Sequence, residues 1–151
     1  MAPRPRSLSR ARSAARRLAV QALYQWQIGG EEPGELVAQF SDRPEMDAAD
    51  RGYFTALVRG CVQGYAGLQD RIAPCLDRPV EQLDPVERAI LLVGAFELRD
   101  RPDVPYRVAI NEAVELAKVF GAQGSHLYVN GVLDRLAGTL RSMEKGRARA
   151  H

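Results

Sequence analysis

The sequence predicts an all-α protein, a single-domain bundle of about six to seven helices. Three observations lead to this class. Several stretches place apolar residues three and four positions apart, which gives each stretch one apolar face. Proline, glycine and capping residues separate these stretches, as they do at helix ends. No stretch shows the alternation of apolar and polar residues that indicates a strand. The 151 residues are enough for one domain with its own core.

The first helix is predicted from about residue 9 to residue 28, before Gly29-Gly30. Its apolar residues share one face, and a polar set that includes Tyr24 lies opposite. An aromatic ring flanked by arginines on a solvent-facing side can stack a base while the cations hold phosphates. The alternative is a solvated basic face with an incidental tyrosine. The apolar face holds Ala15, Leu18, Ala19, Ala22, Leu23 and Trp26, and the opposite face holds Arg10, Arg17, Gln21 and Tyr24.

A short helix over residues 35–40 and a long helix over about residues 47–75 are predicted next. Apolar residues of the long helix step alternately by four and three positions, which is a heptad-like seam for packing along a neighbouring helix. We interpret the seam as core, with a partner-binding surface as the alternative. Pro74 and Pro79 stop the helix. The seam consists of Phe54, Val58, Cys61, Tyr65, Leu68, Ile72 and Cys75.

A helix start is marked by the run Asp84-Pro85-Val86-Glu87. Aspartate caps the helix, proline fits the first turn, and Glu87 follows the cap by three residues. The helix then runs to about Leu98 and is apolar on nearly all sides. This pattern predicts that it is the central and most buried helix.

Two further helices, joined by a short polar loop, are predicted between Val104 and Leu140. Gly121 is expected to end the first in a left-handed conformation, and the Ser125 hydroxyl to cap the second. Gly131 is interpreted as a helical residue that lets another helix approach closely. The apolar stripes are Ile110, Ala113, Val114 and Ala117 in the first helix and Val129, Val132, Leu133, Leu136 and Leu140 in the second.

Charge is distributed unevenly along the chain. Residues 1–17 contain six arginines and no acidic residue, residues 18–140 contain 18 acidic and 11 basic residues, and residues 141–151 contain four basic residues and one acidic residue. We therefore expect a flexible basic arm over residues 1–8, a helical RNA-binding domain over residues 9–140 and a flexible basic tail over residues 141–151. A polyanion would meet the arm, and a basic protein would meet the acidic body.

No catalytic constellation is present, so the sequence predicts a protein that is not an enzyme. There is no glycine-rich phosphate loop or nucleophile elbow, and His126 is the only histidine of the folded body. Cys61 and Cys75 are expected to be buried thiols in a reducing cytosol, and no metal or cofactor is expected. The longest apolar run, Ala89–Phe96, is too short to span a bilayer, and no secretory signal is seen. We expect a cytoplasmic protein without membrane contact.

Two elements supply what RNA binding requires, a cationic segment and base-facing groups. The basic residues of the arm are all arginine, which stacks and forms paired hydrogen bonds better than lysine. The loop over residues 121–130 offers polar side chains and the ring of Tyr128, for which a core position is the alternative. The candidate RNA-binding residues are Arg6, Arg10, Arg12, Arg16, Arg17, Tyr24, Lys118, Gln123, Ser125, His126 and Tyr128.

Several motifs resemble the NusB family of bacterial transcription antitermination factors. The paired C-terminal motifs are INEAVELAKVFG at Ile110–Gly121 and YVNGVLD at Tyr128–Asp134. RRLAVQALYQWQ at Arg16–Gln27 and VERAILLVGAFEL at Val86–Leu98 extend the similarity. It covers most of the chain, from about Arg10 to Leu136.

The resemblance implies an all-helical protein that binds the boxA element of nascent ribosomal RNA together with ribosomal protein NusE. In the family this complex helps RNA polymerase pass terminators. Arg10, Arg12 and Arg16 fall in the family's arginine-rich segment, Tyr24 is the tyrosine of its Ala-Leu-Tyr motif, and Tyr128 matches an aromatic that is often phenylalanine. The implied surface for NusE includes Glu81, Asp84, Glu87, Leu91 and Phe96.

The sequence departs from the family pattern at a few positions. Leu92 stands where many members have arginine, Gly124 and Leu127 occupy loop positions that are often charged, and Cys75 lies where a large aromatic is common. NusB-like domains also precede a methyltransferase domain in some ribosomal RNA cytosine methyltransferases, but no cofactor-binding glycine motif is present here. A helical scaffold that binds only proteins is the alternative from another class. Some family members dimerise, and the sequence leaves a homodimer open.

Overall fold

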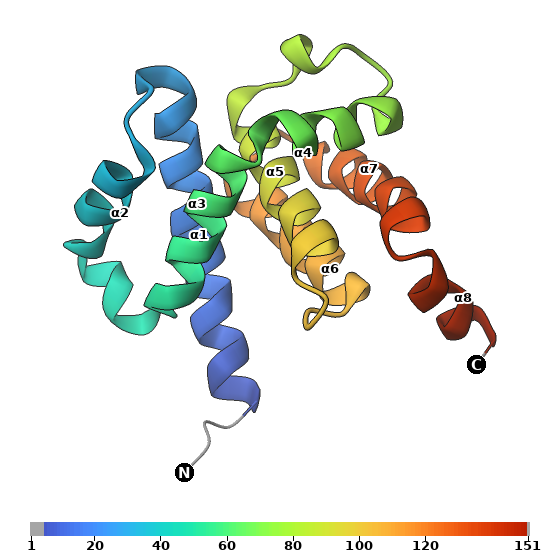
Figure 1. Cartoon of the computed structure of the whole chain (residues 1–151), viewed down its shortest axis with the longest axis horizontal. Helices are drawn as coiled ribbons and strands as arrows, with labels where there is room; N and C mark the ends of the chain where they lie inside the picture. The colour runs from blue at the N-terminus through green and yellow to red at the C-terminus, as the bar shows by residue number, and fades with distance from the viewer. Residues whose placement is uncertain (1–4, 151) are drawn as a thin grey trace. The chain divides into compact units, whose positions relative to one another are not determined.

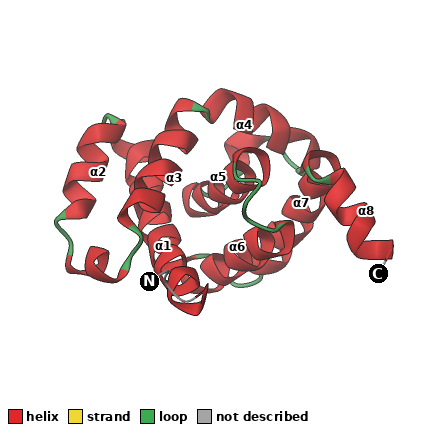
Figure 2. Cartoon of the chain, turned by 60° about the horizontal axis from the view of Figure 1, so that its bottom comes forward, coloured by secondary structure: helices red, strands yellow, loops and turns green. Residues whose placement is uncertain are grey.

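The computed structural model describes the backbone of residues 5–150 and the side chains of residues 7–148. Within that part every regular element is helical, with eight α-helices and three short 3-10 helices (Figure 2). This confirms the predicted all-α class, while the number of helices exceeds the six to seven expected. None of the described helices combines the length and the apolar character that crossing a membrane requires. The chain forms two compact units, divided between Gln63 and Gly64, where the sequence predicted one helical domain.

The first unit contains α1 (Pro5–Gly29), α2 (Pro33–Ser41), the 3-10 helix η1 (Pro44–Ala48) and α3 (Arg51–Gln63). In this unit α1 packs against α2, η1 and α3 (Figure 1). The predicted apolar face of α1 is buried, apart from the half-buried Trp26. Because α1 already begins at Pro5, residues 5–8 of the expected arm are helical, and residues 1–4 lie outside the described residues.

The long helix predicted over residues 47–75 is interrupted. Gly64 leaves the helical conformation, with φ −94° and ψ 12°, and separates α3 from α4 (Tyr65–Ile72). Glycine favours such a break because it has the largest backbone entropy to lose in a helix. The predicted seam is therefore shared between two cores. Phe54, Val58 and Cys61 are buried in the first unit, Leu68 and Ile72 are buried in the second, and Tyr65 and Cys75 are half-buried.

The second unit is arranged around α5 (Pro85–Asp100), which packs against α4, α6 (Tyr106–Phe120) and α7 (Ser125–Leu140). All residues from Ala89 to Leu98 are buried, as the apolar pattern predicted. The Asp84 carboxylate accepts hydrogen bonds from the amides of Val86 at 2.8 Å and Glu87 at 3.4 Å, which confirms the predicted cap. Two short 3-10 helices, η2 (Ala73–Cys75) and η3 (Val80–Gln82), connect α4 to α5.

The close helix approach occurs at Gly94 of α5, and not at Gly131 as predicted. A Cβ atom on Gly94 would lie 2.6 Å from Cδ1 of Leu133, so α5 and α7 meet where this glycine has no side chain. A Cβ atom on Gly131, which is helical as expected, would have only the Arg135 guanidinium near it from outside the adjacent backbone, at 3.8 Å. The Asn130-Gly131 pair therefore faces away from the helix contact that the sequence assigned to it.

The tail predicted as flexible from residue 141 contains helix α8 (Ser142–Ala150). Arg141 donates hydrogen bonds to the carbonyls of Leu98 at 2.7 Å, Arg101 at 2.8 Å and Glu97 at 3.1 Å, all at the end of α5. It also pairs with Glu144 at 2.6 Å, and Glu144 accepts the first amide of α6, from Tyr106, at 2.9 Å. These two side chains cap the end of α5 and the start of α6, where helix ends leave backbone carbonyls and amides without partners inside the helix.

Candidate nucleic-acid interface

An exposed basic stripe runs along α1. Arg10, Arg17 and Tyr24 recur every seven residues and are all exposed, with Tyr24 at 40%. Seven residues are almost two helical turns, so the three side chains point the same way at steps of about 10 Å. Gln21 on the same side is half-buried and accepts a hydrogen bond from Arg43 at 3.2 Å. The side chain of Arg6 lies outside the described residues. This stripe agrees with the solvent-facing side predicted for α1.

Arg12 and Arg16 lie against the aromatic ring of Tyr53. The guanidinium carbons are 4.3 Å and 5.5 Å from the ring centroid, which is a favourable arrangement of a cation with the ring quadrupole. Arg12 is half-buried, whereas Arg16 is only 2% exposed. Arg16 follows directly after Ala15 on the side of α1 that packs into the unit, so it is an interior residue. Its burial does not support the predicted direct contact of Arg16 with RNA.

Tyr53 is itself held at the start of α3. It is buried, and its amide donates a hydrogen bond to the Asp50 carboxylate at 3.0 Å. The Asp50 amide in turn donates to the carbonyl of Ala11 at 2.9 Å. The Tyr53 ring is therefore fixed near the part of α1 from which Arg12 and Arg16 extend.

The loop between α6 and α7 differs from the prediction at both ends. Gly121 ends α6 in an extended conformation, with φ −85° and ψ 169°, and the left-handed residue is Gly124, with φ 84°. Gly121 is needed for space, because a Cβ there would lie 2.7 Å from the carbonyl oxygen of Ala117. Ser125 does not cap α7; it is buried, and its hydroxyl donates to the carboxylate of Glu87 at 2.6 Å. The Ser125 hydroxyl is therefore not exposed for the predicted contact with RNA.

The other polar candidates of this region remain accessible to different degrees. Gln123 is exposed and His126 is half-buried. Lys118 is exposed on α6 and forms an ion pair with Glu115 at 3.3 Å. These side chains are available to a ligand, although the loop presents fewer of its polar groups than the sequence indicated.

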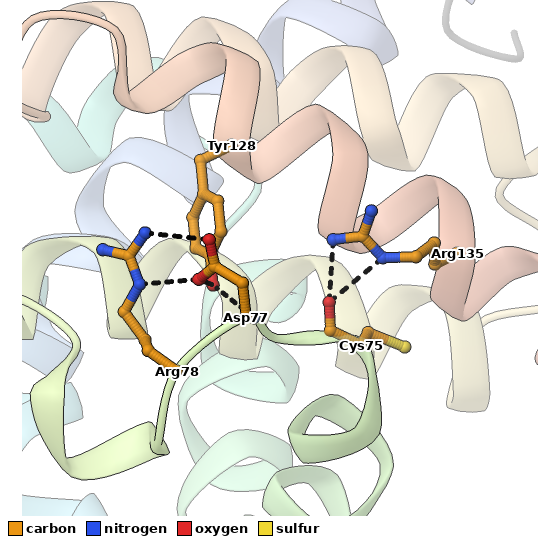
Figure 3. Close-up of polar contacts among 5 residues, drawn as sticks. All are labelled: Cys75, Asp77, Arg78, Tyr128 and Arg135. Carbon is orange, nitrogen blue, oxygen red and sulfur yellow. Dashed lines mark hydrogen bonds and ion pairs between the residues drawn. The ribbon is translucent and has the colours of Figure 1, made fainter.

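Tyr128 belongs to a surface cluster that also contains Asp77 and Arg78 (Figure 3). The half-buried tyrosine extends from α7, and its hydroxyl donates to Asp77 Oδ1 at 2.9 Å and accepts the Asp77 amide at 3.3 Å. The Arg78 guanidinium lies 4.5 Å from the ring centroid and binds the Asp77 carboxylate at 2.7 Å. Hydrogen bonds from Arg78 and then Tyr128 lower the pKa of Asp77 to about 2, and burial raises the pKa of Tyr128.

The sequence did not indicate Asp77 and Arg78 as functional residues, because Pro74 and Pro79 on either side of them predict only the end of a helix. They meet a residue some 50 positions further along the chain, and no local pattern signals that contact. The same segment is held to α7 a second time, because the Arg135 guanidinium donates twice to the carbonyl of Cys75, at 2.8 and 3.1 Å (Figure 3).

The predicted protein-partner surface is only partly a surface. Glu81 and Asp84 are exposed, and Glu87 is half-buried against Ser125. Leu91 is completely buried and Phe96 is buried as well, so the assignment of these two residues to a surface was wrong. The reason is the central position of α5, which packs against α4, α6 and α7.

No group of side chains in the described part of the chain could hold a metal ion. Both cysteines are free thiols, but only Cys61 is buried as predicted, while Cys75 is half-buried. The chemistry available at the candidate interface is therefore that of arginine, tyrosine and polar side chains. Such groups bind phosphates and stack bases.

Comparison with known proteins agrees with the motifs. The model of the NusB family matches residues 13–138. The transcription antitermination protein NusB of Paraburkholderia phytofirmans is 52% identical over 139 residues, which cover 92% of this chain and 96% of that protein. The NusB of Alcanivorax borkumensis is also 52% identical over 139 residues, covering 92% of this chain and 93% of that one.

Two solved structures are similar in fold as well. T. maritima NusB is 29% identical, with a TM-score of 0.74, over 84% of this chain and 91% of that chain. A chain from the crystal structure of antitermination factors NusB and NusE in complex with dsRNA is 28% identical, with a TM-score of 0.72, over 82% of this chain and 93% of that chain. With a family model that spans most of its length and relatives at this level of identity, the chain belongs to the NusB family.

Proposed function

We propose that this chain is a transcription antitermination factor that binds the boxA element of nascent ribosomal RNA together with ribosomal protein NusE. In this complex it supports read-through of terminators by RNA polymerase in the bacterial cytoplasm. The observation that carries the proposal is the exposed stripe of Arg10, Arg17 and Tyr24 on α1 in a member of the NusB family. A related chain that has been crystallised with NusE and dsRNA supports both partners.

The stripe and the acidic residues near α5 have different roles in the proposed complex. Arginines that neutralise RNA phosphates release counterions, and each such contact adds about −0.7 to the slope of log K against log salt. The exposed ring of Tyr24 offers a stacking surface for an unpaired base. The exposed carboxylates of Glu81 and Asp84 give a basic ribosomal protein a complementary surface.

The test is fluorescence anisotropy with boxA RNA and a scrambled RNA of equal length, with and without NusE. We expect a preference for boxA that increases when NusE is present. Equal affinity for the two RNAs in the presence of NusE would contradict the specific function, and RNA indifference with intact NusE binding would favour a protein-only scaffold. Transcription through a terminator downstream of boxA, with and without the chain, tests read-through, and sedimentation of the free chain tests for a homodimer.

The contributions of the stripe can be separated by substitution. Arg17→Ala is expected to reduce the salt slope by about 0.7 if Arg17 contacts a phosphate. Tyr24→Ala is expected to weaken binding while leaving the slope unchanged. Arg59→Ala is the matched control, because Arg59 is also an exposed arginine of the first unit and lies on α3. An effect of Arg59→Ala equal to that of Arg17→Ala would mean that only net charge matters.

A further inference from the structure

Arg78 is an exposed arginine whose orientation is fixed by two neighbours. Its guanidinium lies 4.5 Å from the Tyr128 ring centroid, and its Nε and Nη2 atoms bind the two carboxylate oxygens of Asp77 at 2.7 and 3.2 Å (Figure 3). The Tyr128 hydroxyl donates to the same carboxylate at 2.9 Å. The side chain of Arg78 nevertheless keeps 43% of its surface exposed. A planar cation is thus held against a ring with part of its surface facing solvent.

The charge of this arginine is already balanced. Asp77 is ionised at neutral pH, and the hydrogen bonds from Arg78 and then Tyr128 lower its pKa further, to about 2. The hydrogen bond with Asp77 is the main cause that raises the pKa of Arg78, and the negative charge of Glu87 adds to this effect. A phosphate would therefore meet a site without excess positive charge. A stacking interaction does not have this difficulty, since it depends on a planar surface and tolerates a neutral site.

We propose that Arg78, held by Tyr128 and Asp77, is a stacking platform for an unpaired base of the bound RNA. Guanidinium planes and aromatic rings are the surfaces on which single-stranded RNA bases stack. The arginine extends the aromatic surface of Tyr128, whose position in the first turn of α7 places the platform next to the α6–α7 loop. The proposal rests on the proposed RNA-binding function and adds a residue that the sequence motifs did not indicate.

The decisive experiment compares Arg78→Ala and Arg78→Lys in the full chain, with NusE and single-stranded boxA RNA, by anisotropy at several salt concentrations. We expect Arg78→Ala to weaken binding by about 5- to 100-fold, the range for loss of one stacked base, with an unchanged salt slope. Arg78→Lys is expected to be nearly as weak, because an ammonium group keeps the charge and lacks the planar surface. Circular dichroism verifies that both variants are folded.

Arg107→Ala is the matched control. Arg107 is also exposed and also contacts a tyrosine, with its guanidinium 5.7 Å from the Tyr106 ring centroid and its Nε donating to the Tyr106 hydroxyl at 3.1 Å. It lies at the start of α6, about 20 Å along the helix from the loop that follows Phe120. We expect this variant to bind RNA like the wild type.

Asp77→Asn examines the role of charge. Loss of the carboxylate leaves Arg78 with an unbalanced charge, so we expect the salt slope to become steeper by up to about 0.7 as the guanidinium gains a phosphate contact.

Three results would overturn the proposal. The first is that Arg78→Ala binds RNA with wild-type affinity. The second is that Arg78→Lys fully restores RNA binding while Arg78→Ala loses part of the salt slope. The third is that Arg78→Ala binds NusE more weakly with its RNA affinity unchanged. If the wild-type chain bound boxA and scrambled RNA equally well, the proposed function would be contradicted instead. Titrations of the wild-type chain with both RNAs therefore separate this failure from a failure of the Arg78 proposal.

Discussion

Two arginine–tyrosine contacts in this protein use the same chemistry in opposite surroundings. In the first unit, Arg16 and Tyr53 are both buried, and the ring is tied to α1 through Asp50. In the second, Arg78 is exposed on a half-buried Tyr128. A buried contact contributes chiefly to folding because its groups are removed from water, whereas an exposed contact contributes little stability and leaves its groups available to a ligand. An arginine-rich motif therefore does not by itself identify the arginines that contact RNA.

The largest expected difference is in stability. Tyr53→Ala should lower the free energy of unfolding by about 3–5 kcal/mol, because it removes a buried aromatic ring. Tyr128→Ala should lower it by about 2–3 kcal/mol, the sum of two hydrogen bonds and one exposed cation–π contact. Urea unfolding followed by circular dichroism measures both, and fluorescence of the single tryptophan, Trp26 in α1, reports the first unit. Equal losses would show that burial does not separate the two contacts.

A similar contrast, between a tightly packed position and one with free space, separates two glycines. Gly94→Ala should destabilise the protein by about 1–3 kcal/mol, because its Cβ would lie 2.6 Å from Leu133 in the contact of α5 with α7. Gly131→Ala should leave stability unchanged or raise it by up to about 1 kcal/mol, since alanine favours helix and has room there. Thermal unfolding of the two variants measures the difference. If Gly131→Ala destabilised the protein, the close approach between helices would lie at Gly131, as the sequence predicted.

A smaller effect, specific to the exposed contact, is the titration of Asp77. Its pKa is about 2 in the folded protein against 3.8 for a free side chain, so any stabilisation it gives is complete above pH 3.8 and is lost as the pH falls through 2. Carboxyl ¹³C NMR should show no titration of Asp77 between pH 7 and pH 4. Arg78→Ala should move its pKa back towards 3.8, and Tyr128→Phe should do so to a lesser degree. An unchanged pKa in both variants would mean that neither side chain holds the carboxylate.

The smallest expected effect is that of Lys118 on stability. Lys118→Ala removes an exposed ion pair with Glu115, which contributes less than about 0.5 kcal/mol in such helix pairs. If Lys118 contacts RNA, the variant should nevertheless lose about 0.7 of the salt slope in RNA binding. Urea unfolding and RNA titration of the same sample separate the two roles. A clear loss of stability would mean that Lys118 contributes to the fold as much as a buried residue does.

Periodicity predicted the helices whose stability depends on an apolar face. It also predicted the exposure of Tyr24, because position on a helix follows directly from spacing. It did not predict the break at Gly64, since one glycine inside a regular heptad pattern has no separate signal. It did not predict α8 either, because this helix is polar and is held by Arg141 and Glu144 through contacts about 40 residues away in the chain.

The candidate site was predictable to the extent that it is local. The charge of Arg16 indicated exposure, whereas in the structure it is buried against the ring of Tyr53, which another helix supplies. Ser125 has the right side chain for a cap, yet its hydroxyl is taken by Glu87 of α5. The cluster of Asp77, Arg78 and Tyr128 joins segments that carry no shared motif. Residue type and spacing describe one helix at a time, whereas these contacts depend on which helices become neighbours.

The position of Arg141 and Glu144 also has a consequence for synthesis of the chain on the ribosome. The Leu98 carbonyl at the end of α5 and the first amide of α6, from Tyr106, receive partners that are translated about 40 residues later. These two groups therefore leave the ribosome still bonded to water. The second unit reaches its final hydrogen bonding only after residue 144 has been translated, while the helices of the first unit are all translated before residue 64. A stop codon at Arg141 would therefore leave the Leu98 carbonyl and the Tyr106 amide permanently bonded to water.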